Sequence, residues 1–153
     1  MEGLRIVPVS DEGALRRAAE VHAVSWQDSH RSFCPPDFVA AHTPERQYRY
    51  LADKAAGGSR IFLLLREGET PIGVVTVTGD LIADLYILPA ERNKGYGTVL
   101  LQYAIGQCSG SSTLWILENN TGAERLYRRN GFRPTGRILE HPGGLSEREF
   151  LHP

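Results

Sequence analysis

The sequence has few cysteines, almost no net charge and no long apolar run, and each of these features excludes a class of protein. The chain of 153 residues has two cysteines outside any C-x-x-C pattern, which excludes a disulfide framework and predicts a reducing, cytoplasmic setting. Its 17 basic and 18 acidic residues give a net charge of -1, so no basic platform for nucleic acid is expected. No stretch approaches the roughly 18 apolar residues of a membrane span, and no signal-peptide segment is visible.

Metal-site spacing is also missing from the sequence. The five histidines form no metal motif, and His30 with Cys34 is at most one isolated pair, so no metal is expected. His22 falls on the apolar face of a predicted helix, and we interpret it as a buried interface residue rather than a ligand.

The composition is that of an ordinary globular protein. Apolar residues make up 41% of the chain and charged residues 23%, which argues against disorder. No low-complexity linker divides the chain, and its length is typical of one domain. We therefore predict a single domain spanning residues 1–153.

The order of the expected elements predicts a mixed sheet. Three apolar or β-branched segments between residues 60 and 88 are joined by turns too short for anything but antiparallel pairing. The second half alternates strands with helices, which indicates a strand–helix–strand unit. The predicted fold class is α/β (α+β), with a central mixed, mostly antiparallel sheet and helices on both faces. The expected elements are a strand (4–9), a helix from 11 to the loop 28–36, a helix (44–56), three strands (60–66, 72–78, 81–88), a helix (97–108), a strand (113–117), a helix (121–130) and two strands (137–140, 146–151).

Capping and turn residues support these boundaries. Ser10 or Asp11 is suited to cap the first helix, and Thr43, followed by a proline, is suited to cap the second. The residues 141–144, His-Pro-Gly-Gly, predict the turn of a closing hairpin.

The most informative local segment is residues 85–101. A strand ends near Pro89, a basic loop follows, and a helix begins at Gly97. Gly95 and Gly97 allow several backbone N–H groups to point in the same direction, and the helix N-terminus adds partial positive charge. The loop is therefore suited to bind a pyrophosphate. A plain glycine-rich turn is the alternative. A P-loop would need its lysine after the glycines, and a dinucleotide fingerprint would need a third glycine in place of Leu100.

Two blocks of the sequence resemble the GNAT N-acetyltransferase superfamily. The pattern R-x-x-G-x-G, formed by Arg92, Gly95 and Gly97 after a strand, resembles the acyl-CoA motif of that family. A second block, residues 114–132, resembles the family's second half in its order of strand, Asn, helix, Tyr and Gly-Phe. Asn93 departs from the pattern, because many members have Gly there. Since Asn tolerates a left-handed backbone, we expect a local adjustment at this position.

The resemblance implies acetyl-CoA as cosubstrate and a role for each motif. In the family, the strand bearing Ile87 separates from the strand bearing Ile116, and the pantetheine arm enters the gap. Backbone N–H groups near Ile87 would polarise the thioester carbonyl, Asn120 would bind the arm, and Tyr127 would donate a proton to the thiolate. The implied cofactor-binding residues are Ile87, Leu88, Arg92, Asn93, Lys94, Gly95, Tyr96, Gly97, Thr98, Asn120 and Tyr127.

The implied acceptor is a primary amine of a small molecule or peptide. A lysine-like ammonium has a pKa near 10.4, so something must remove its proton. Asp84 and Glu118 are the candidate general bases, and a water chain is the alternative. In the family the segment between the first two helices walls the acceptor site, so Trp26, His30 and Phe33 are candidate substrate-binding residues. Simple capping of the core is an equally consistent role for these aromatic side chains.

The resemblance thus implies an N-acetyltransferase that uses direct attack in a ternary complex, because no activated nucleophile is visible. A catalytically silent acyl-CoA-binding or sensor module is the alternative, and the presence of both Asn120 and Tyr127 favours the enzyme. Family members are often dimers, so a homodimer is a further expectation. No nucleic-acid or membrane partner is expected.

Overall fold

The computed structural model describes residues 3–153. Its elements, in chain order, are β1 (Arg5–Pro8), α1 (Glu12–His30), α2 (Pro36–Ala40), α3 (Pro44–Ala56), β2 (Arg60–Arg66), β3 (Thr70–Thr78), β4 (Leu81–Ile87), the 3-10 turn η1 (Pro89–Glu91), α4 (Tyr96–Gly106), β5 (Ser112–Leu117), α5 (Thr121–Arg129), β6 (Arg133–Glu140) and β7 (Ser146–His152).

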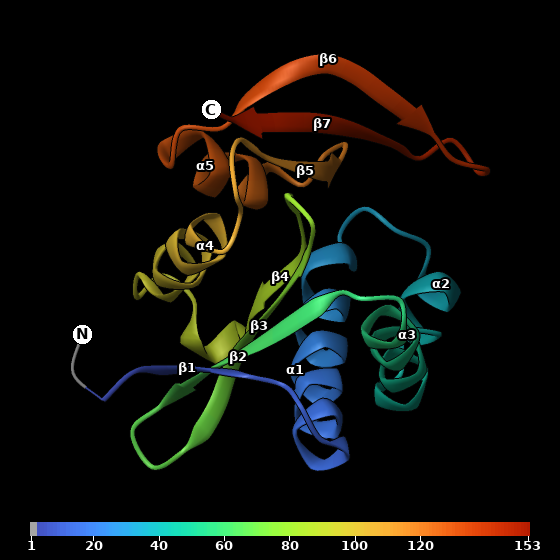
Figure 1. Ribbon diagram of the computed structural model, residues 1–153. Coiled ribbons are helices and arrows are strands. Elements are labelled where there is room, and N and C mark those ends of the chain that lie inside the picture. Colours follow the sequence, from blue (N-terminus) through green and yellow to red (C-terminus); the bar gives the residue numbers. More distant parts are fainter. Residues whose placement is uncertain (1–2) are drawn as a thin grey trace.

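Within residues 3–153, seven strands form one sheet in the order β1-β2-β3-β4-β5-β7-β6 (Figure 1). The first four strands pair antiparallel with their neighbours, and β5 then joins β4 in parallel. The strands β7 and β6 complete the sheet with antiparallel pairs. The predicted mixed, mostly antiparallel sheet is confirmed.

Helices cover both faces of this sheet, as predicted. The helices α1 and α3 pack on one face through Ala18, Ala19 and Leu51. On the other face, α4 packs through Leu100 and Leu101, and α5 lies beside it (Figure 1). Within residues 3–153, no helix is both long and apolar enough to cross a bilayer.

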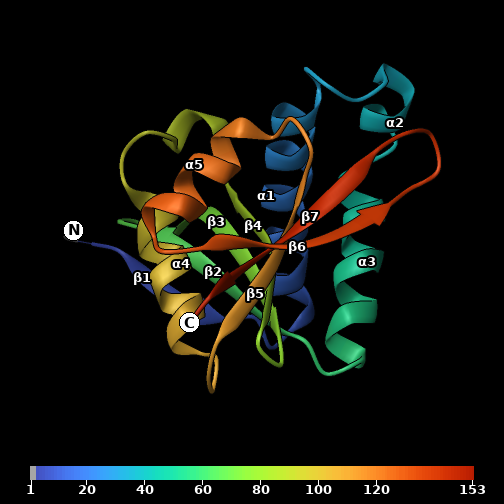
Figure 2. The ribbon, with the colours of Figure 1, turned by 90° about the horizontal axis from the view of Figure 1, so that it is seen from above.

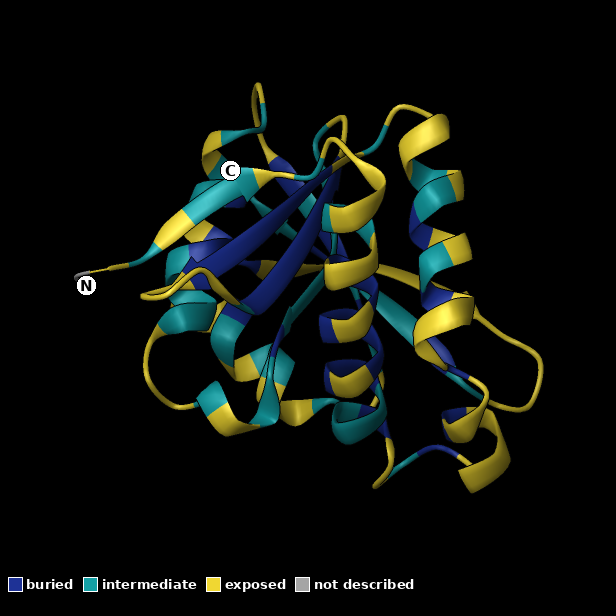
Figure 3. Ribbon diagram, turned by 90° about the horizontal axis from the view of Figure 1, so that it is seen from below, coloured by how far each residue is buried: buried dark blue, intermediate teal, exposed yellow. Residues whose placement is uncertain are grey.

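The strand β2 shows why helices must pack on both faces of the sheet. Its five central residues, from Ile61 to Leu65, are all buried, and successive side chains on a strand point to opposite faces. Ile61, Leu63 and Leu65 join the α1–α3 cluster, whereas Phe62 and Leu64 join the α4 cluster. Figure 3 shows the consequence, with buried central strands between helices whose outer surfaces are exposed.

The expected caps are present. The Asp11 carboxylate accepts a hydrogen bond from Ala14 N over 2.8 Å and begins α1. The Thr43 hydroxyl accepts from Arg46 N over 3.1 Å and begins α3, whose first residue is a proline. Each cap satisfies a backbone N–H that has no partner inside its helix.

Three departures from the sequence-based prediction involve more than two residues. The helix α1 continues to His30, past the expected stop at residue 28, because the first helix-breaking residue is Pro35. The sequence-based prediction lacks the short helix α2. It treats the prolines there only as the end of a helix, but a proline also fits the first turn of a new helix. The strand β6 begins at Arg133 rather than at 137, because an edge strand tolerates Pro134.

The β6–β7 hairpin closes one side of the molecule. Its predicted turn is present, with His141 N donating to Leu145 O over 2.7 Å. Figure 2 shows the hairpin extending toward the side that carries α2 and α3. Leu145 there packs against the cluster of Trp26, Cys34 and Val39, which belongs to α1, the following loop and α2.

Two irregularities in β4 position the site. Val74 pairs with Tyr86 but Thr76 with Ala83, so β4 carries one more residue than β3 between these pairs, a β-bulge. Asp84 lies in this bulge with a φ of 52°. The parallel pairing of β4 with β5 is confined, within the described residues, to Leu81 and Thr113. Beyond this point the two strands separate.

Candidate active site

The separation of β4 from β5 opens a cleft of about 780 Å³. It is lined by both strands, the loop before α4, the beginning of α5 and the last turn of α1. The expected gap between the strands bearing Ile87 and Ile116 is therefore present. The predicted site residues that line the cleft are Trp26, His30, Phe33, Asp84, Ile87, Arg92, Asn93, Gly95, Tyr96, Gly97, Thr98, Asn120 and Tyr127.

Three predicted site residues lie outside the cleft lining. The N–H of Leu88 donates to Ile72 O over 2.9 Å, so it is not free to polarise a thioester. The Lys94 ammonium pairs with Glu91 over 3.2 Å. The Glu118 carboxylate accepts from the Ser146 hydroxyl over 2.8 Å, on the β7 side. This placement does not suit Glu118 to reach an amine in the cleft, because a general base must lie within hydrogen-bond reach of the proton.

The loop before α4 has the backbone of an anion-binding turn. Asn93 and Gly95 have φ values of 63° and 86°, so both are left-handed. Asn93 thus adopts the left-handed backbone that we expected it to tolerate. Gly95 precedes α4 without a side-chain cap, and a helix leaves its first N–H groups without partners inside the helix. Residues 96–98, whose N–H groups belong to this first turn, line the cleft.

Gly97 has a packing role that the motif did not reveal. A Cβ atom built there would lie 3.3 Å from Leu126 Cδ2 and 3.9 Å from Ile87 Cγ1. The glycine thus allows α4 to approach α5 closely. A larger side chain would press on the cleft lining from within.

Arg92 is turned toward α1. Its Nε donates to Ile87 O over 3.2 Å, and its Nη2 donates to Ser25 O and Ser29 Oγ over 3.2 and 3.1 Å. The Nη1 group forms an ion pair with Asp28. The guanidinium therefore joins the end of β4 to the last turn of α1.

Tyr127 lies on the side of the cleft formed by α5. Its side chain is buried and packs edge-on against Phe132, with ring centroids 5.9 Å apart. Burial, followed by the nearby charge of Asp84, raises the pKa of Tyr127 above its usual value. The hydroxyl therefore keeps its proton at neutral pH. Asn120 begins α5, and its Oδ1 accepts from Ala123 N over 3.4 Å.

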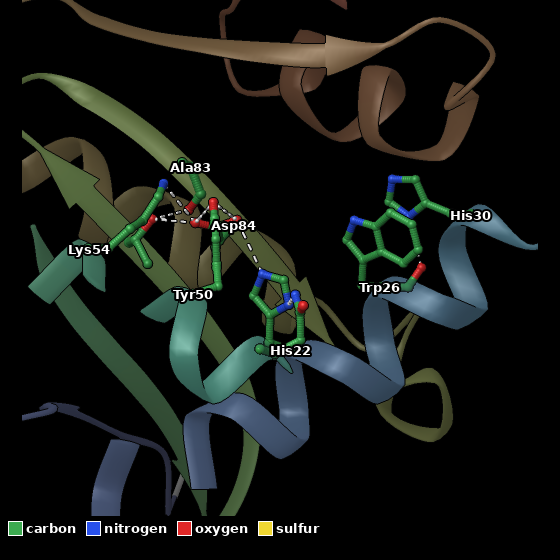
Figure 4. Close-up of polar contacts among 9 residues, drawn as sticks. His22, Trp26, His30, Tyr50, Lys54, Ala83 and Asp84 are labelled. Atoms are coloured by element: carbon green, nitrogen blue, oxygen red, sulfur yellow. Dashed lines mark hydrogen bonds and ion pairs between the residues drawn. The ribbon is translucent and has the colours of Figure 1, made fainter. Parts of the chain in front are cut away.

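Asp84 is held by partners from three elements (Figure 4). Burial alone would raise its pKa, but the hydrogen bond and charge of His22, with the charge of Lys54, hold the pKa well below its usual value. A carboxylate this acidic and this fully bonded is a poor general base at neutral pH. Its hydrogen-bond partners are His22 Nε2 at 3.1 Å, Tyr50 Oη at 3.1 Å, Lys54 Nζ at 3.1 Å and Thr76 Oγ1 at 2.9 Å.

Aromatic rings line the cleft beside α1. Trp26 is stacked between His30, at 4.0 Å, and His42, at 3.5 Å, with interplanar angles of 7° and 10°. The ring centroids of Phe33 and Tyr86 lie 5.2 and 6.3 Å from that of His30. The candidate substrate-binding residues Trp26, His30 and Phe33 thus lie together.

His30 is a neutral hydrogen-bond acceptor in this wall. Its Nδ1 lies 2.8 Å from Trp26 O, and a carbonyl can only accept, so Nδ1 carries the proton. In the neutral ring the other nitrogen, Nε2, is then an acceptor. Burial lowers the pKa of His30 to about 4, although the bond to Trp26 opposes the shift. Figure 4 shows Nε2 pointing away from α1.

The sequence profile described as the acetyltransferase (GNAT) family matches residues 23–132. This chain belongs to the GNAT family. The matched range contains every predicted site residue, from Trp26 to Tyr127, whereas the β6–β7 hairpin lies beyond it.

Individual relatives agree with this assignment. Peptidyl-lysine N-acetyltransferase YjaB of Salmonella typhimurium LT2 is 31% identical over 77 residues, which are 50% of this chain and 52% of the relative. The match thus spans about half the length of this curated relative. The solution structure of apo YjaB from Escherichia coli has a TM-score of 0.71 at 19% identity, covering 97% of each chain. Spermidine N-acetyltransferase from Vibrio cholerae, in complex with CoA and spermine, has a TM-score of 0.69 at 16% identity, covering 99% of this chain and 95% of that one.

Several residues that contribute to this GNAT site are not among the predicted site residues. Tyr86 and Tyr50 line the cleft, and Lys54 pairs with Asp84. His22 contacts Asp84 through Nε2 and Gln47 through Nδ1, at 3.1 and 2.7 Å. Its interpretation as a buried interface residue is confirmed. The alternation within residues 81–88 could have drawn attention to Tyr86, but the bulge at Asp84 changes which side chains face the cleft.

Proposed function

We propose that the protein transfers an acetyl group from acetyl-CoA to a primary amine of a small molecule or peptide. The observation that carries the proposal is the continuity of one cleft from the anion-binding loop to the aromatic rings beside α1. We call the loop from Arg92 to Thr98, with the first turn of α5 and Tyr127, the donor wall. We call the last turn of α1, with Phe33 and β4 around Asp84, the acceptor wall.

The donor wall has the chemistry that acetyl-CoA requires. The pyrophosphate would rest on the N–H groups of residues 93–98, where the helix N-terminus adds partial positive charge. The pantetheine arm, a flat amide chain, would lie between β4 and β5, near Asn120. Backbone near Ile87 would then face the thioester carbonyl, whose oxygen gains negative charge during attack.

The reaction is a direct transfer. The amine nitrogen forms a bond to the acetyl carbon, and the bond from that carbon to sulfur breaks, leaving CoA as a thiolate. Tyr127 donates a hydrogen bond to this sulfur. An ordinary tyrosine pKa, near 10, already exceeds that of a free thiol, near 8.5, and burial raises the pKa of Tyr127 further. Full transfer of its proton is therefore unfavourable, and water supplies the final proton.

The proton of the attacking amine leaves through water in the cleft. Asp84 is engaged by four partners and Glu118 lies on the β7 side, so neither is placed to accept it. His30 Nε2, a neutral acceptor, orients an N–H of the amine. A cationic imidazole would repel an ammonium, and the lowered pKa of His30 prevents this repulsion at neutral pH.

The aromatic acceptor wall suits an amine at the end of an alkyl chain. Trp26, Phe33 and Tyr86 offer apolar surface beside the neutral acceptor of His30, and aromatic faces also attract alkylammonium groups. The names of the relatives point the same way, since a peptidyl lysine and spermine both carry such amines.

The test is release of free thiol from acetyl-CoA with a panel of lysine peptides, free lysine and polyamines. Mass spectrometry of the acceptor should show one added acetyl group. Transfer to a member of the panel supports the proposal. Binding of CoA without transfer to any amine would instead favour a silent acyl-CoA-binding module. A thermal shift with NAD but none with CoA would contradict both.

A further inference from the structure

The contacts of Arg92 leave it little capacity for a phosphate. A guanidinium has five N–H groups. The contacts with Ile87 O, Ser25 O, Ser29 Oγ and Asp28 occupy four of them. Only one N–H then remains for a ligand, whereas tight binding of a phosphate by arginine is commonly bidentate.

The position of these contacts is informative. Ser25, Asp28 and Ser29 are interleaved on α1 with Trp26 and His30, which form the acceptor wall. On the other side, Arg92 directly precedes Asn93, the first left-handed residue of the donor wall. The side chains of Arg92 and Asp28 are 31% and 36% exposed, so the pair is neither buried nor freely solvated.

We propose that Arg92 is a positioning residue that holds the phosphate-binding loop against the last turn of α1, and so couples occupancy of the donor wall to the acceptor wall. We call the Arg92–Asp28 contact, with the bonds to Ser25 and Ser29, the latch. The proposal rests on the proposed function, because it assumes that CoA occupies the donor wall. It changes the role of Arg92 from a cofactor-binding residue, as the resemblance implies, to a structural link.

Trp26 offers a direct readout of the latch. The chain has two tryptophans, so Trp115→Phe leaves Trp26 as the sole indole. Trp26 adjoins Ser25 in sequence and is stacked between two imidazoles, so its emission depends on how the last turn of α1 is held. In the Trp115→Phe protein, saturating CoA should change the emission of Trp26.

Two substitutions break the latch while leaving the rest of the loop intact. Arg92→Lys keeps the positive charge but loses the planar fork that reaches several acceptors at once. Asp28→Asn keeps the shape of the side chain but loses the ion pair. In the Trp115→Phe background, each should lose most of the CoA-dependent change at saturation. The comparison at saturation is independent of any change in affinity.

Glu12→Gln is the matched control. Glu12 pairs with Arg16 over 3.1 Å at the opposite end of α1, so this variant removes an ion pair from the same helix, away from the cleft. It should keep the full change in Trp26 emission. Calorimetric titration with CoA establishes saturation, and circular dichroism establishes folding, for every variant.

The outcomes separate the latch from the proposed function. Loss of the signal in Arg92→Lys and Asp28→Asn, with the signal kept in Glu12→Gln, supports the latch. A full signal in either latch variant, or no signal in the Trp115→Phe protein although CoA binds, overturns it. Failure of the unmodified protein to bind CoA overturns the proposed function, which calorimetry reports independently of Trp26.

Discussion

The donor wall and the acceptor wall of the cleft are held in different ways. The donor wall is shaped by backbone, through the left-handed residues Asn93 and Gly95 and the free first turn of α4. The acceptor wall is shaped by side chains, through the hydrogen-bond partners of Asp84 and the rings stacked on Trp26. Changes in the donor wall should therefore alter ligand binding or rate at little cost in stability, and changes in the acceptor wall should lower stability first.

The largest effect is expected for Asp84→Ala. The change leaves Lys54 and His22 facing a buried site without their shared carboxylate. Removing one partner of a fully buried charge pair costs about 3–5 kcal/mol. Because the Lys54 and Asp84 side chains are 25% and 11% exposed, the loss should lie toward the lower end of this range. Urea unfolding should show this as a lower midpoint with an unchanged slope.

A matched control for this prediction is Glu124→Ala. Glu124 pairs with Arg128 and Arg148 at the surface, at 2.8 and 3.2 Å, where an ion pair is worth at most about 1 kcal/mol. An equal loss in both variants would mean that the network around Asp84 does not hold the acceptor wall.

The second effect is a dependence of stability on pH that originates at His30. Its pKa is lowered from 6.5 to about 4 in the folded protein. The unfolded chain therefore binds more protons between these values, and stability falls as the pH decreases from 6.5 toward 4. The full shift corresponds to about 3 kcal/mol. Urea midpoints measured across this range give the slope.

His30→Gln should reduce the dependence of stability on pH in this range. A smaller pH dependence should remain, because burial also lowers the pKa of His42. Asp84 contributes in a separate window: its folded pKa is depressed, so its stabilisation is lost only below its unfolded value, near pH 3.9. An unchanged slope in His30→Gln would show that the acceptor wall does not depend on a neutral His30.

The third effect tests the donor wall through Tyr127→Phe. The hydroxyl is lost and the ring that packs on Phe132 is kept, so stability should change little. The rate constant kcat should fall by about 10- to 100-fold, at or below the lower end of the range for general acid catalysis, because the raised pKa makes the hydroxyl a weak acid. KM for acetyl-CoA should stay nearly constant. An unchanged kcat with a lower unfolding midpoint would make Tyr127 a packing residue.

The smallest effect separates two roles of Asn120. Asn120→Ala removes the cap of α5 and should cost about 1 kcal/mol of stability. Asn120→Asp keeps an oxygen for Ala123 N and should preserve stability. It lacks the amide donor and adds a negative charge, so CoA binding measured by calorimetry should weaken. Equal CoA affinity in Asn120→Asp and the unmodified protein would leave Asn120 with the capping role alone.

The same contrast between walls explains what could be predicted from sequence. The caps at Asp11 and Thr43, the turn at Gly95 and the adjustment at Asn93 depend on residues close in the chain, and all are present as expected. The gap between β4 and β5 came from the family resemblance, and it too is present.

The interactions of Asp84 could not be predicted, because they join residues far apart in sequence. Its contacts with His22, Tyr50 and Lys54 span 62, 34 and 30 positions. Neither hydrophobic periodicity nor a motif encodes which distant side chain will face a carboxylate. For the same reason the family resemblance implies only a cofactor-binding role for Arg92, whereas the structure gives it partners on α1 that lie 63 to 67 positions away.

The short pairing between β4 and β5 has a mechanical consequence. Within the described residues, the sheet consists of two parts, β1–β4 and β5–β7–β6. Among these residues, the two parts are paired only where Leu81 of β4 meets Thr113 of β5. Past that point, interstrand hydrogen bonds do not fix the angle between the two parts. A ligand arm lying between β4 and β5 would supply contacts where these hydrogen bonds are missing, so a bound ligand would itself help to hold the two parts of the sheet together.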